Sequence, residues 1–275
     1  MKIAIYISLL SDMTSTPHFN EKDWEYLIEK SSKLGFNGIE ILPQSAEEFP
    51  AKQLKEILER YGMKLCVIGT GAGKLLNNFT FTDPDITVRK KAIEYVSSLI
   101  QVAGEFNAMI LIGAMQGNTQ QGVSRAQAME WLTESILQLA NISIKNQIKL
   151  LLEPINRYES NLVNSLKQGA ELIRGLSGIS NVRLVGDIFH MNIEEANMQE
   201  SIIENKELIA HYHIADSNRL APGMGHTDFK SLAAAIRATG YDEYLSVECF
   251  TNNNSEVAMK KSIDTFKTYF LNQEI

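Results

Sequence analysis

The chain has 275 residues, enough to bury a large core, and a formal net charge of −7 at pH 7. That acidic balance argues against a nucleic-acid-binding surface, which is normally basic. Two cysteines, Cys66 and Cys249, are too few for a disulfide framework; because each lies in an apolar run, we expect buried free thiols. We find no apolar segment long enough to cross a membrane and no secretory signal, and therefore expect a cytoplasmic protein with no membrane partner.

The first half of the chain alternates predicted strands with predicted helices. Strands are expected at residues 3–7, 38–42, 64–68 and 108–112, and helices at about 24–34, at 51–61, from Asp83-Pro84 to about 103, and after Ser124. Gly35 and Gly62 are expected to end the first two helices. The segment from Gly69 to Lys74 superficially resembles a phosphate loop, but its spacing is not that of a Walker motif, so we expect a flexible loop covering a site.

The second half continues the alternation, and each of its four strands ends on a polar group. These strand ends are Glu153, Asp187, His213 and Glu248, with helices expected near residues 165–176, 193–208, 229–239 and 257–271. Eight strands alternating with eight helices predict an α/β fold with a single (β/α)8 TIM barrel domain over residues 1–275. The alternative is a doubly wound sheet, but the glycine fingerprint of its dinucleotide-binding version is absent after the first strand.

The four strand ends predict a divalent-metal centre. A carboxylate or imidazole at the end of a buried strand is costly to bury unless it is paired or coordinates a metal. The carboxyl ends of barrel strands converge on one pocket, so these groups are expected to share a site. Two Glu, one Asp and one His form a mixed oxygen and nitrogen set that suits Mn, Mg, Zn or Co.

Five segments in order carry a family resemblance. They are Glu153 to Glu159 (EPINRYE), Gly186 to Asn192 (GDIFHMN), His211 to Arg219 (HYHIADSNR), Gly225 to Phe229 (GHTDF) and Ser246 to Glu248 (SVE). The chain resembles the sugar isomerase/epimerase barrels related to xylose isomerase, and most closely their ketose 3-epimerase branch. The resemblance extends over the whole barrel, with its specific motifs in the second half.

The resemblance implies roles for named residues. One divalent ion, Mn²⁺ by preference and otherwise Mg²⁺, Co²⁺ or Zn²⁺, would be bound by Glu153, Asp187, His213 and Glu248. Glu153 and Glu248 would also act as the acid/base pair. His190 and Arg219 would hold substrate oxygens, and Glu159 would support the sugar. The implied partner is a sugar or sugar phosphate, and because relatives commonly associate, a homodimer or homotetramer is expected.

The implied chemistry is physically reasonable. A proton next to a ketone is too weakly acidic to leave unaided, and a metal that polarises the carbonyl stabilises the enediolate by several kcal/mol. Inversion of the stereocentre needs a base on one face and an acid on the other, which Glu on the fifth and eighth strands can provide. Arg219 and His190 can donate hydrogen bonds to the developing negative charge.

Several further residues are assigned outside the ligand set. His211, His226 and Asp216 are expected to support the site: His211 by packing next to His213, His226 by ordering a loop, and Asp216 by orienting Arg219 or a loop. Glu40, at the end of the second strand, is equally consistent with substrate binding and with a simple salt bridge. His18 is expected on the surface, and Lys74 is expected to be solvated.

Other functions remain open from the residues alone. An aldose–ketose isomerase uses the same enediolate, and an inosose-type dehydratase uses the same metal and base but expels a hydroxyl. An abasic-site endonuclease of this fold would need additional His ligands on the early strands, and no His occurs between His18 and His190. A non-catalytic sugar-binding barrel would require the ligand set to be accidental.

Overall fold

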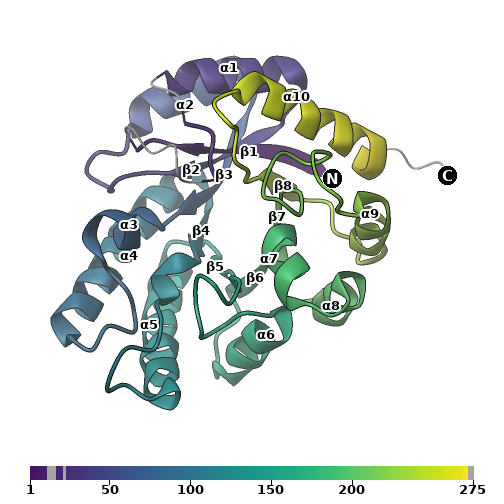
Figure 1. Cartoon of the computed structure of the whole chain (residues 1–275). Helices are drawn as coiled ribbons and strands as arrows, with labels where there is room; N and C mark the ends of the chain where they lie inside the picture. The colour runs from purple at the N-terminus through teal and green to yellow at the C-terminus, as the bar shows by residue number, and fades with distance from the viewer. Residues whose placement is uncertain (11–16, 21–22, 272–275) are drawn as a thin grey trace.

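The fold is a closed barrel of eight parallel strands in the order β1 to β8, as seen in a computed structural model that describes residues 1–10, 17–20 and 23–271 (Figure 1). The sequence prediction of a (β/α)8 barrel is confirmed. The strands are β1 (Lys2–Ser8), β2 (Gly38–Leu42), β3 (Lys64–Gly69), β4 (Met109–Ile112), β5 (Leu150–Leu152), β6 (Val182–Asp187), β7 (Ile209–Ile214) and β8 (Tyr244–Val247).

Helices surround the barrel on the outside (Figure 1). The α-helices are α1 (Trp24–Leu34), α2 (Ala51–Tyr61), α3 (Ala72–Asn77), α4 (Ile86–Phe106), α5 (Arg125–Lys145), α6 (Leu166–Gly175), α7 (Ile188–Glu194), α8 (Met198–Asn205), α9 (Phe229–Ala238) and α10 (Ser255–Phe266). A short 3₁₀ helix, η1 (Ala114–Gln116), follows β4, and a π-helical turn, η2 (Lys267–Leu271), follows α10. None of the described helices has the length and apolar character needed to cross a membrane.

The predicted helix ends are largely confirmed. The side chains of Asp23 and Ser124 accept hydrogen bonds from the first turns of α1 and α5, as expected of N-cap residues. Gly35 and Gly62 end α1 and α2 in the left-handed conformation, with φ of 106° and 66°. These are positions where a side chain would be strained, so the glycines fix where both helices stop.

Two helix predictions are wrong in detail. The long helix α4 begins at Ile86, not at Asp83-Pro84, because Asp85 is its N-cap and accepts from the backbone N–H of Thr87. Asp83 instead accepts from the backbone N–H of Asp85 and forms the turn before the helix. The helix expected at 193–208 is two helices, α7 and α8, since Asn197 is extended and caps a new helix there.

The segment from Gly69 to Lys74 is also different from expectation. It is not simply a loop after β3, because α3 begins at Ala72. Gly73 packs against the ring of Tyr95, where a Cβ atom would lie only 2.8 Å from a ring carbon. The segment therefore brings Lys74 to the carboxyl end of the barrel on a helix.

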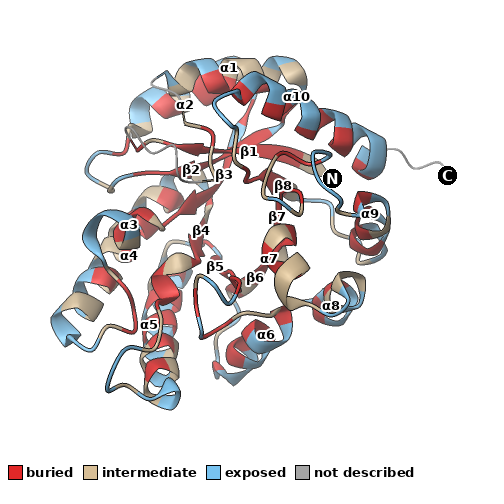
Figure 2. Ribbon diagram, viewed as in Figure 1, coloured by how far each residue is buried: buried red, intermediate tan, exposed pale blue. Residues whose placement is uncertain are grey.

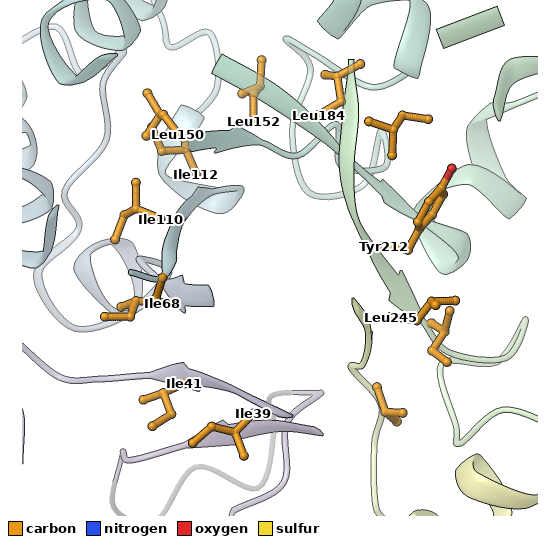
Figure 3. Close-up of a cluster of buried hydrophobic side chains, with 14 of the residues drawn as sticks. Ile39, Ile41, Ile68, Ile110, Ile112, Leu150, Leu152, Leu184, Tyr212 and Leu245 are labelled. Carbon is orange, nitrogen blue, oxygen red and sulfur yellow. The ribbon is translucent and has the colours of Figure 1, made fainter. Parts of the chain in front are cut away.

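The strands are buried on both sides, against the surrounding helices and against the side chains inside the barrel. Strand residues such as Ile39, Ile110, Leu150 and Leu184 belong to the large core between barrel and helices (Figures 2 and 3). A separate cluster from β1, β3, β4, β5 and β6 lies inside the barrel: Ala4, Cys66, Val67, Leu111, Leu151 and Val185. Cys66 and Cys249 are buried free thiols, as predicted.

Candidate metal centre

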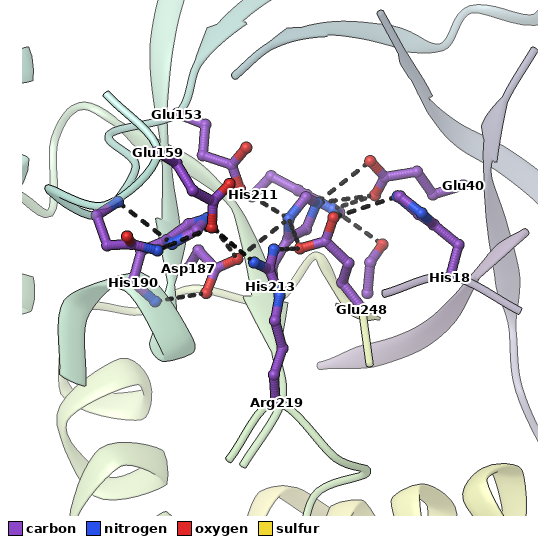
Figure 4. A network of polar contacts seen from close by, with 12 residues as sticks. His18, Glu40, Glu153, Glu159, Asp187, His190, His211, His213, Arg219 and Glu248 are labelled. Atoms are coloured by element: carbon purple, nitrogen blue, oxygen red, sulfur yellow. Dashed lines mark hydrogen bonds and ion pairs between the residues drawn. The ribbon is translucent and has the colours of Figure 1, made fainter. Parts of the chain in front are cut away.

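Four side chains converge at the carboxyl end of the barrel (Figure 4). Glu153 directly follows β5, Asp187 ends β6, His213 lies near the end of β7, and Glu248 directly follows β8. All four are buried, and one ligand atom from each lies within 4.8 Å of the others. The structure therefore brings together the complete ligand set that the strand ends predicted.

His213 stands at the centre of this cluster. Its Nδ1 atom lies 2.9 Å from Oε1 of Glu153, 3.5 Å from Oε2 of Glu248 and 3.7 Å from Oδ2 of Asp187. Asp187 is held on its other side, because its Oδ1 accepts the backbone N–H of His190 and caps α7. One oxygen of Asp187 is therefore fixed by the helix while the other faces His213.

The donor atoms in the cluster fit a divalent ion. Within the described part of the chain, Nδ1 of His213 and Oε1 of Glu153 are buried and have no hydrogen-bond partner, although they are 2.9 Å apart. Buried polar atoms without partners are costly. Three carboxylates and one imidazole directed at a common point form the oxygen and nitrogen set that Mn²⁺, Mg²⁺, Co²⁺ or Zn²⁺ accepts.

The pKa shifts of the buried carboxylates also favour a divalent ion at this site. Burial raises the pKa of Glu153 to about 7, and the neighbouring Glu248 and Asp187 add to this increase while His213 opposes it. For Glu248, burial also favours the neutral form, but Arg219 and His213 outweigh it and hold the pKa well below its usual range. Three buried carboxylates thus share one small space, and a divalent ion would relieve the repulsion between their charged forms.

Arg219 links the ligand set to a second group of polar residues. Its Nη2 lies 3.1 Å from Oε2 of Glu248 and its Nη1 lies 2.9 Å from Oε1 of Glu159, while the guanidinium lies 4.6 Å above the ring of Phe189. Its backbone has a φ of 59°, which is uncommon for a residue with a side chain. The site therefore places this cation beside one ligand and one residue of the predicted sugar-binding set.

His190 is oriented by Asn156. The backbone N–H of Asn156 lies 3.3 Å from Nδ1 of His190, and its side-chain amide nitrogen lies 2.8 Å from the same atom. Both groups are donors, so Nδ1 is the acceptor and the hydrogen of the neutral ring is on Nε2. The amide of Asn156 also lies 2.9 Å from Oε1 of Glu159, so His190, Glu159 and Arg219 form one connected group.

A cavity of about 440 Å³ opens onto these groups. Its polar lining includes Glu153, Glu248, Glu159, His190 and Arg219. Leu42, Leu75, Leu111 and Ile155 are among its apolar lining residues. A larger hollow of about 750 Å³ lies at the opposite end of the barrel, and none of the four candidate ligands lines it. The smaller cavity is therefore the candidate substrate site.

The three expected supporting residues lie in different places. His211 is fully buried beneath the ligands, where its Nε2 lies 3.0 Å from Glu40. Asp216 is buried and accepts backbone N–H groups of Ser217, Gly223 and Thr227, so it orders the loop after β7. The side chain of His226 is exposed, and only its backbone N–H joins this loop network, through the hydroxyl of Ser217.

Sequence reasoning misplaced or left undecided three residues of this region. Glu40 is fully buried, lies 3.2 Å from Nε2 of His213 and pairs with this histidine, and it does not line the cavity. The sequence placed it at the end of the second strand, but it lies in the middle of β2, and a lone carboxylate within a buried apolar strand was the available signal. His18 is not a surface residue: its side chain is 9% exposed, lines the cavity and lies 3.3 Å from Glu248. Lys74 is half-buried and also lines the cavity, so it is not fully solvated.

Comparison with known proteins gives one family. The sequence profile of the xylose isomerase-like TIM barrel family matches residues 28–269. The D-psicose 3-epimerase of Ruminiclostridium cellulolyticum is 26% identical over 248 residues, which cover 86% of this chain and 82% of the relative. The 3-dehydro-D-guloside 4-epimerase of Escherichia coli is 34% identical over 117 residues, which cover 42% of this chain and 44% of the relative.

Solved structures share the fold at low sequence identity. A D-psicose 3-epimerase from Clostridium cellulolyticum, solved with D-tagatose, has a TM-score of 0.81 and 23% identity, and the alignment covers 98% of this chain and 99% of the other. A family 2 AP endonuclease from Brucella melitensis has a TM-score of 0.78 and 17% identity, with coverage of 98% and 99%. The fold alone therefore does not separate an epimerase from an endonuclease.

Proposed function

The chain belongs to the xylose isomerase-like TIM barrel family, and from this premise we propose that it is a divalent-metal-dependent sugar epimerase of the ketose 3-epimerase type. The observation that carries the proposal is the convergence of ligand atoms of Glu153, Asp187, His213 and Glu248 within 4.8 Å of one another, with Glu153 and Glu248 lining one cavity. The relatives named as epimerases of sugars support the same reaction class.

The four convergent side chains would hold the cation. When bound there, the ion supplies Lewis acidity that polarises the substrate carbonyl and neutralises developing negative charge. The close approach of three buried carboxylates and the unpartnered Nδ1 of His213 support this assignment. Manganese is the proposed native ion, and Mg²⁺, Co²⁺ and Zn²⁺ fit the same donor set.

Two carboxylates would transfer the proton. One of Glu153 and Glu248 removes the proton from the carbon next to the carbonyl, and the other returns a proton to the opposite face of that carbon. The substrate is neither oxidised nor reduced, and only the configuration at that carbon changes. The two side chains belong to β5 and β8, which two strands separate around the barrel, so they can approach the substrate from different sides.

The other cavity residues would bind and orient the sugar. Nε2–H of His190 and the guanidinium of Arg219 are donors for oxygens that gain negative charge in the transition state. Asn156 fixes the donor nitrogen of His190, while Glu159 and Glu248 fix the position of Arg219. Because these donors are held before substrate arrives, little reorganisation accompanies the reaction.

A second candidate is 4-epimerisation of a 3-keto sugar glycoside. The relative of highest identity among those described, at 34%, is a 3-dehydro-D-guloside 4-epimerase, although the likeness covers less than half of each chain. The chemistry is equivalent, because the inverted carbon is again adjacent to a ketone. The two functions differ only in whether the cavity accepts a free ketose or a glycoside.

The test is epimer formation by metal-loaded protein. Protein treated with a chelator and then reloaded with Mn²⁺ would be incubated with a panel of free ketoses and 3-keto glycosides, and products would be followed by ¹³C NMR and mass spectrometry. We expect an epimer of unchanged mass, formed only with metal. Loss of water from the substrate would instead indicate a dehydratase, and an aldose product would indicate an aldose–ketose isomerase.

The proposal includes a sugar or sugar phosphate as partner, a cytoplasmic location and a homodimer or homotetramer. Sedimentation equilibrium of the full chain measures the assembly directly, and a monomer across micromolar concentrations would contradict that part.

A further inference from the structure

A polar network lies inside the barrel, beneath the candidate metal ligands. It contains Glu40 from β2, His211 and His213 from β7, and Ser246 from β8 (Figure 4). All four residues are fully buried, and His213 is the one among them that also belongs to the convergent ligand set. Buried polar groups in this position are costly unless they do something that an apolar core cannot.

The two nitrogens of His213 have opposite surroundings. Nε2 lies 3.2 Å from each carboxylate oxygen of Glu40, whereas Nδ1 faces Glu153, Asp187 and Glu248. An ionised carboxylate can only accept hydrogen bonds, so the group facing Glu40 is Nε2–H. In a neutral imidazole the lone pair is then on Nδ1, the nitrogen that faces the other ligands.

The carboxylate of Glu40 is itself held in position by a second histidine, His211. Its Oε2 also lies 3.0 Å from Nε2 of His211, and that nitrogen lies 2.9 Å from the hydroxyl of Ser246. Nε2 of His211 and Nε2 of His213 thus lie within hydrogen-bond distance of one and the same carboxylate. The carboxylate is thus an acceptor for two imidazole donors.

We propose that Glu40 is a positioning residue that selects Nδ1 of His213 as the metal-binding atom and fixes the plane of its ring. His211 acts one step further away, by holding the carboxylate of Glu40. The proposal rests on the proposed function only in that a cation binds at the convergent ligands. Partners of this kind commonly change metal affinity by about tenfold to a hundredfold.

A second metal ion at Glu40, His211 and His213 is the competing interpretation, because these three residues are also close enough to share an ion. It requires a lone pair on Nε2 of both histidines. A neutral His213 cannot offer lone pairs on both nitrogens, so this site would compete with the first one. The separations of 3.0 to 3.2 Å are direct hydrogen-bond lengths. The hydrogen-bonded arrangement is therefore favoured, and the metal count distinguishes the two.

The experiment measures Mn²⁺ binding by isothermal titration calorimetry to the full chain, its Glu40→Gln variant and a Ser246→Ala control. The hydroxyl of Ser246 lies within hydrogen-bond distance of His211, and none of the described side-chain hydrogen bonds joins it to His213, its neighbour across the sheet. We expect one ion per wild-type chain, a Kd about tenfold to a hundredfold weaker in Glu40→Gln, and a Ser246→Ala value within about twofold of wild type. A folded Glu40→Gln variant with wild-type affinity would overturn the proposal, as would two ions per wild-type chain.

A spectroscopic readout keeps the proposal testable if Glu40→Gln does not fold. In wild-type protein labelled with ¹⁵N-histidine and loaded with diamagnetic Zn²⁺, NMR should show hydrogen on Nε2 of His213 and none on Nδ1. Hydrogen on Nδ1 would overturn the proposal. If the wild type binds metal and shows this pattern but epimerises no sugar, only the proposed function fails. If the wild type binds no divalent ion, both fail.

Discussion

Gly113 packs so closely against Glu153 that a Cβ atom at position 113 would overlap the carboxylate oxygen Oε2. The loop after β4 therefore fixes where the Glu153 carboxylate can lie.

The first prediction follows from this contact. In Gly113→Ala the added methyl should displace Glu153, and Mn²⁺ affinity should fall by about tenfold or more. Gly175→Ala is the matched control, because nothing lies within 4 Å of a Cβ atom there. Calorimetric titration checks both variants. Equal affinity in the two would show that Glu153 is not held by this contact or does not bind the ion.

A second prediction concerns the guanidinium fork of Arg219, that is, its two terminal nitrogens Nη1 and Nη2. Its two terminal nitrogens contact different carboxylates, of Glu159 and Glu248, which a lysine ammonium cannot do in the same geometry. Arg219→Lys should lower kcat/KM by about 10²- to 10³-fold while keeping the charge. The control, Arg157→Lys, changes an exposed arginine paired with Glu194 outside the cavity. A loss in the control as large as that in Arg219→Lys would rule out a specific role for the fork.

The third prediction concerns Asp216 and the loop after β7. Burial raises the pKa of Asp216, but the backbone N–H groups of Thr227 and Ser217 are among the groups that outweigh it and hold the pKa below its usual value. A folded pKa below the unfolded one means that ionisation stabilises the fold above the unfolded pKa, and this contribution is lost as the pH falls through the folded pKa.

Asp216→Asn should therefore lower the free energy of unfolding by about 1.5–3 kcal/mol at pH 7, the range for hydrogen bonds to a charged group. The difference from wild type should shrink as the pH is lowered below about 4, the usual pKa of an aspartate. Urea unfolding of the wild type and the variant, at pH 7 and at a pH below about 4, measures the difference in the free energy of unfolding. If the free energies of unfolding of wild type and variant differ by the same amount at the two pH values, the charge of the Asp216 carboxylate does not contribute to stability.

The fourth prediction concerns the charge of the substrate. Lys74 lines the cavity, and no carboxylate of the described chain lies within ion-pairing distance of its ammonium group. By contrast, Arg219 is already paired twice. Lys74→Met should lower kcat/KM for ketose phosphates and leave kcat/KM for the matching free ketoses unchanged. The substitution removes a cation that can pair with a phosphate group, whereas the hydroxyl of a free ketose carries no charge to pair with. Equal effects on both members of each pair would contradict a role for Lys74 in binding the anion.

Much of the site could be predicted because its residues follow a simple local rule. Leu150 to Glu153 is an apolar run that ends in a carboxylate, and the closed parallel sheet requires every such end to face the same mouth. The rule does not extend to Glu40, which lies in the middle of the buried strand β2 and whose polar partner belongs to a strand distant in sequence. No local pattern identifies such a partner.

The parts that could not be predicted depend on the path of loops. His18 lies in the connection after β1, and only the course of that connection brings it to Glu248. The boundary between α7 and α8 depends on Asn197 acting as an N-cap, in a segment whose apolar spacing also suits one continuous helix. In both cases, tertiary contacts or a cap outweighed the periodic pattern.

The most direct test of the account is exchange of the proton next to the carbonyl. Mn²⁺-loaded wild type and Glu248→Gln would be incubated with a ketose panel in D₂O, and deuterium would be located by NMR. We predict incorporation at the carbon beside the carbonyl by the wild type, dependent on the metal and lost in Glu248→Gln, whose amide can neither transfer the proton nor supply the anionic oxygen that the ion needs. Absence of deuterium from every sugar, with metal shown to be bound, would contradict the proposed epimerase.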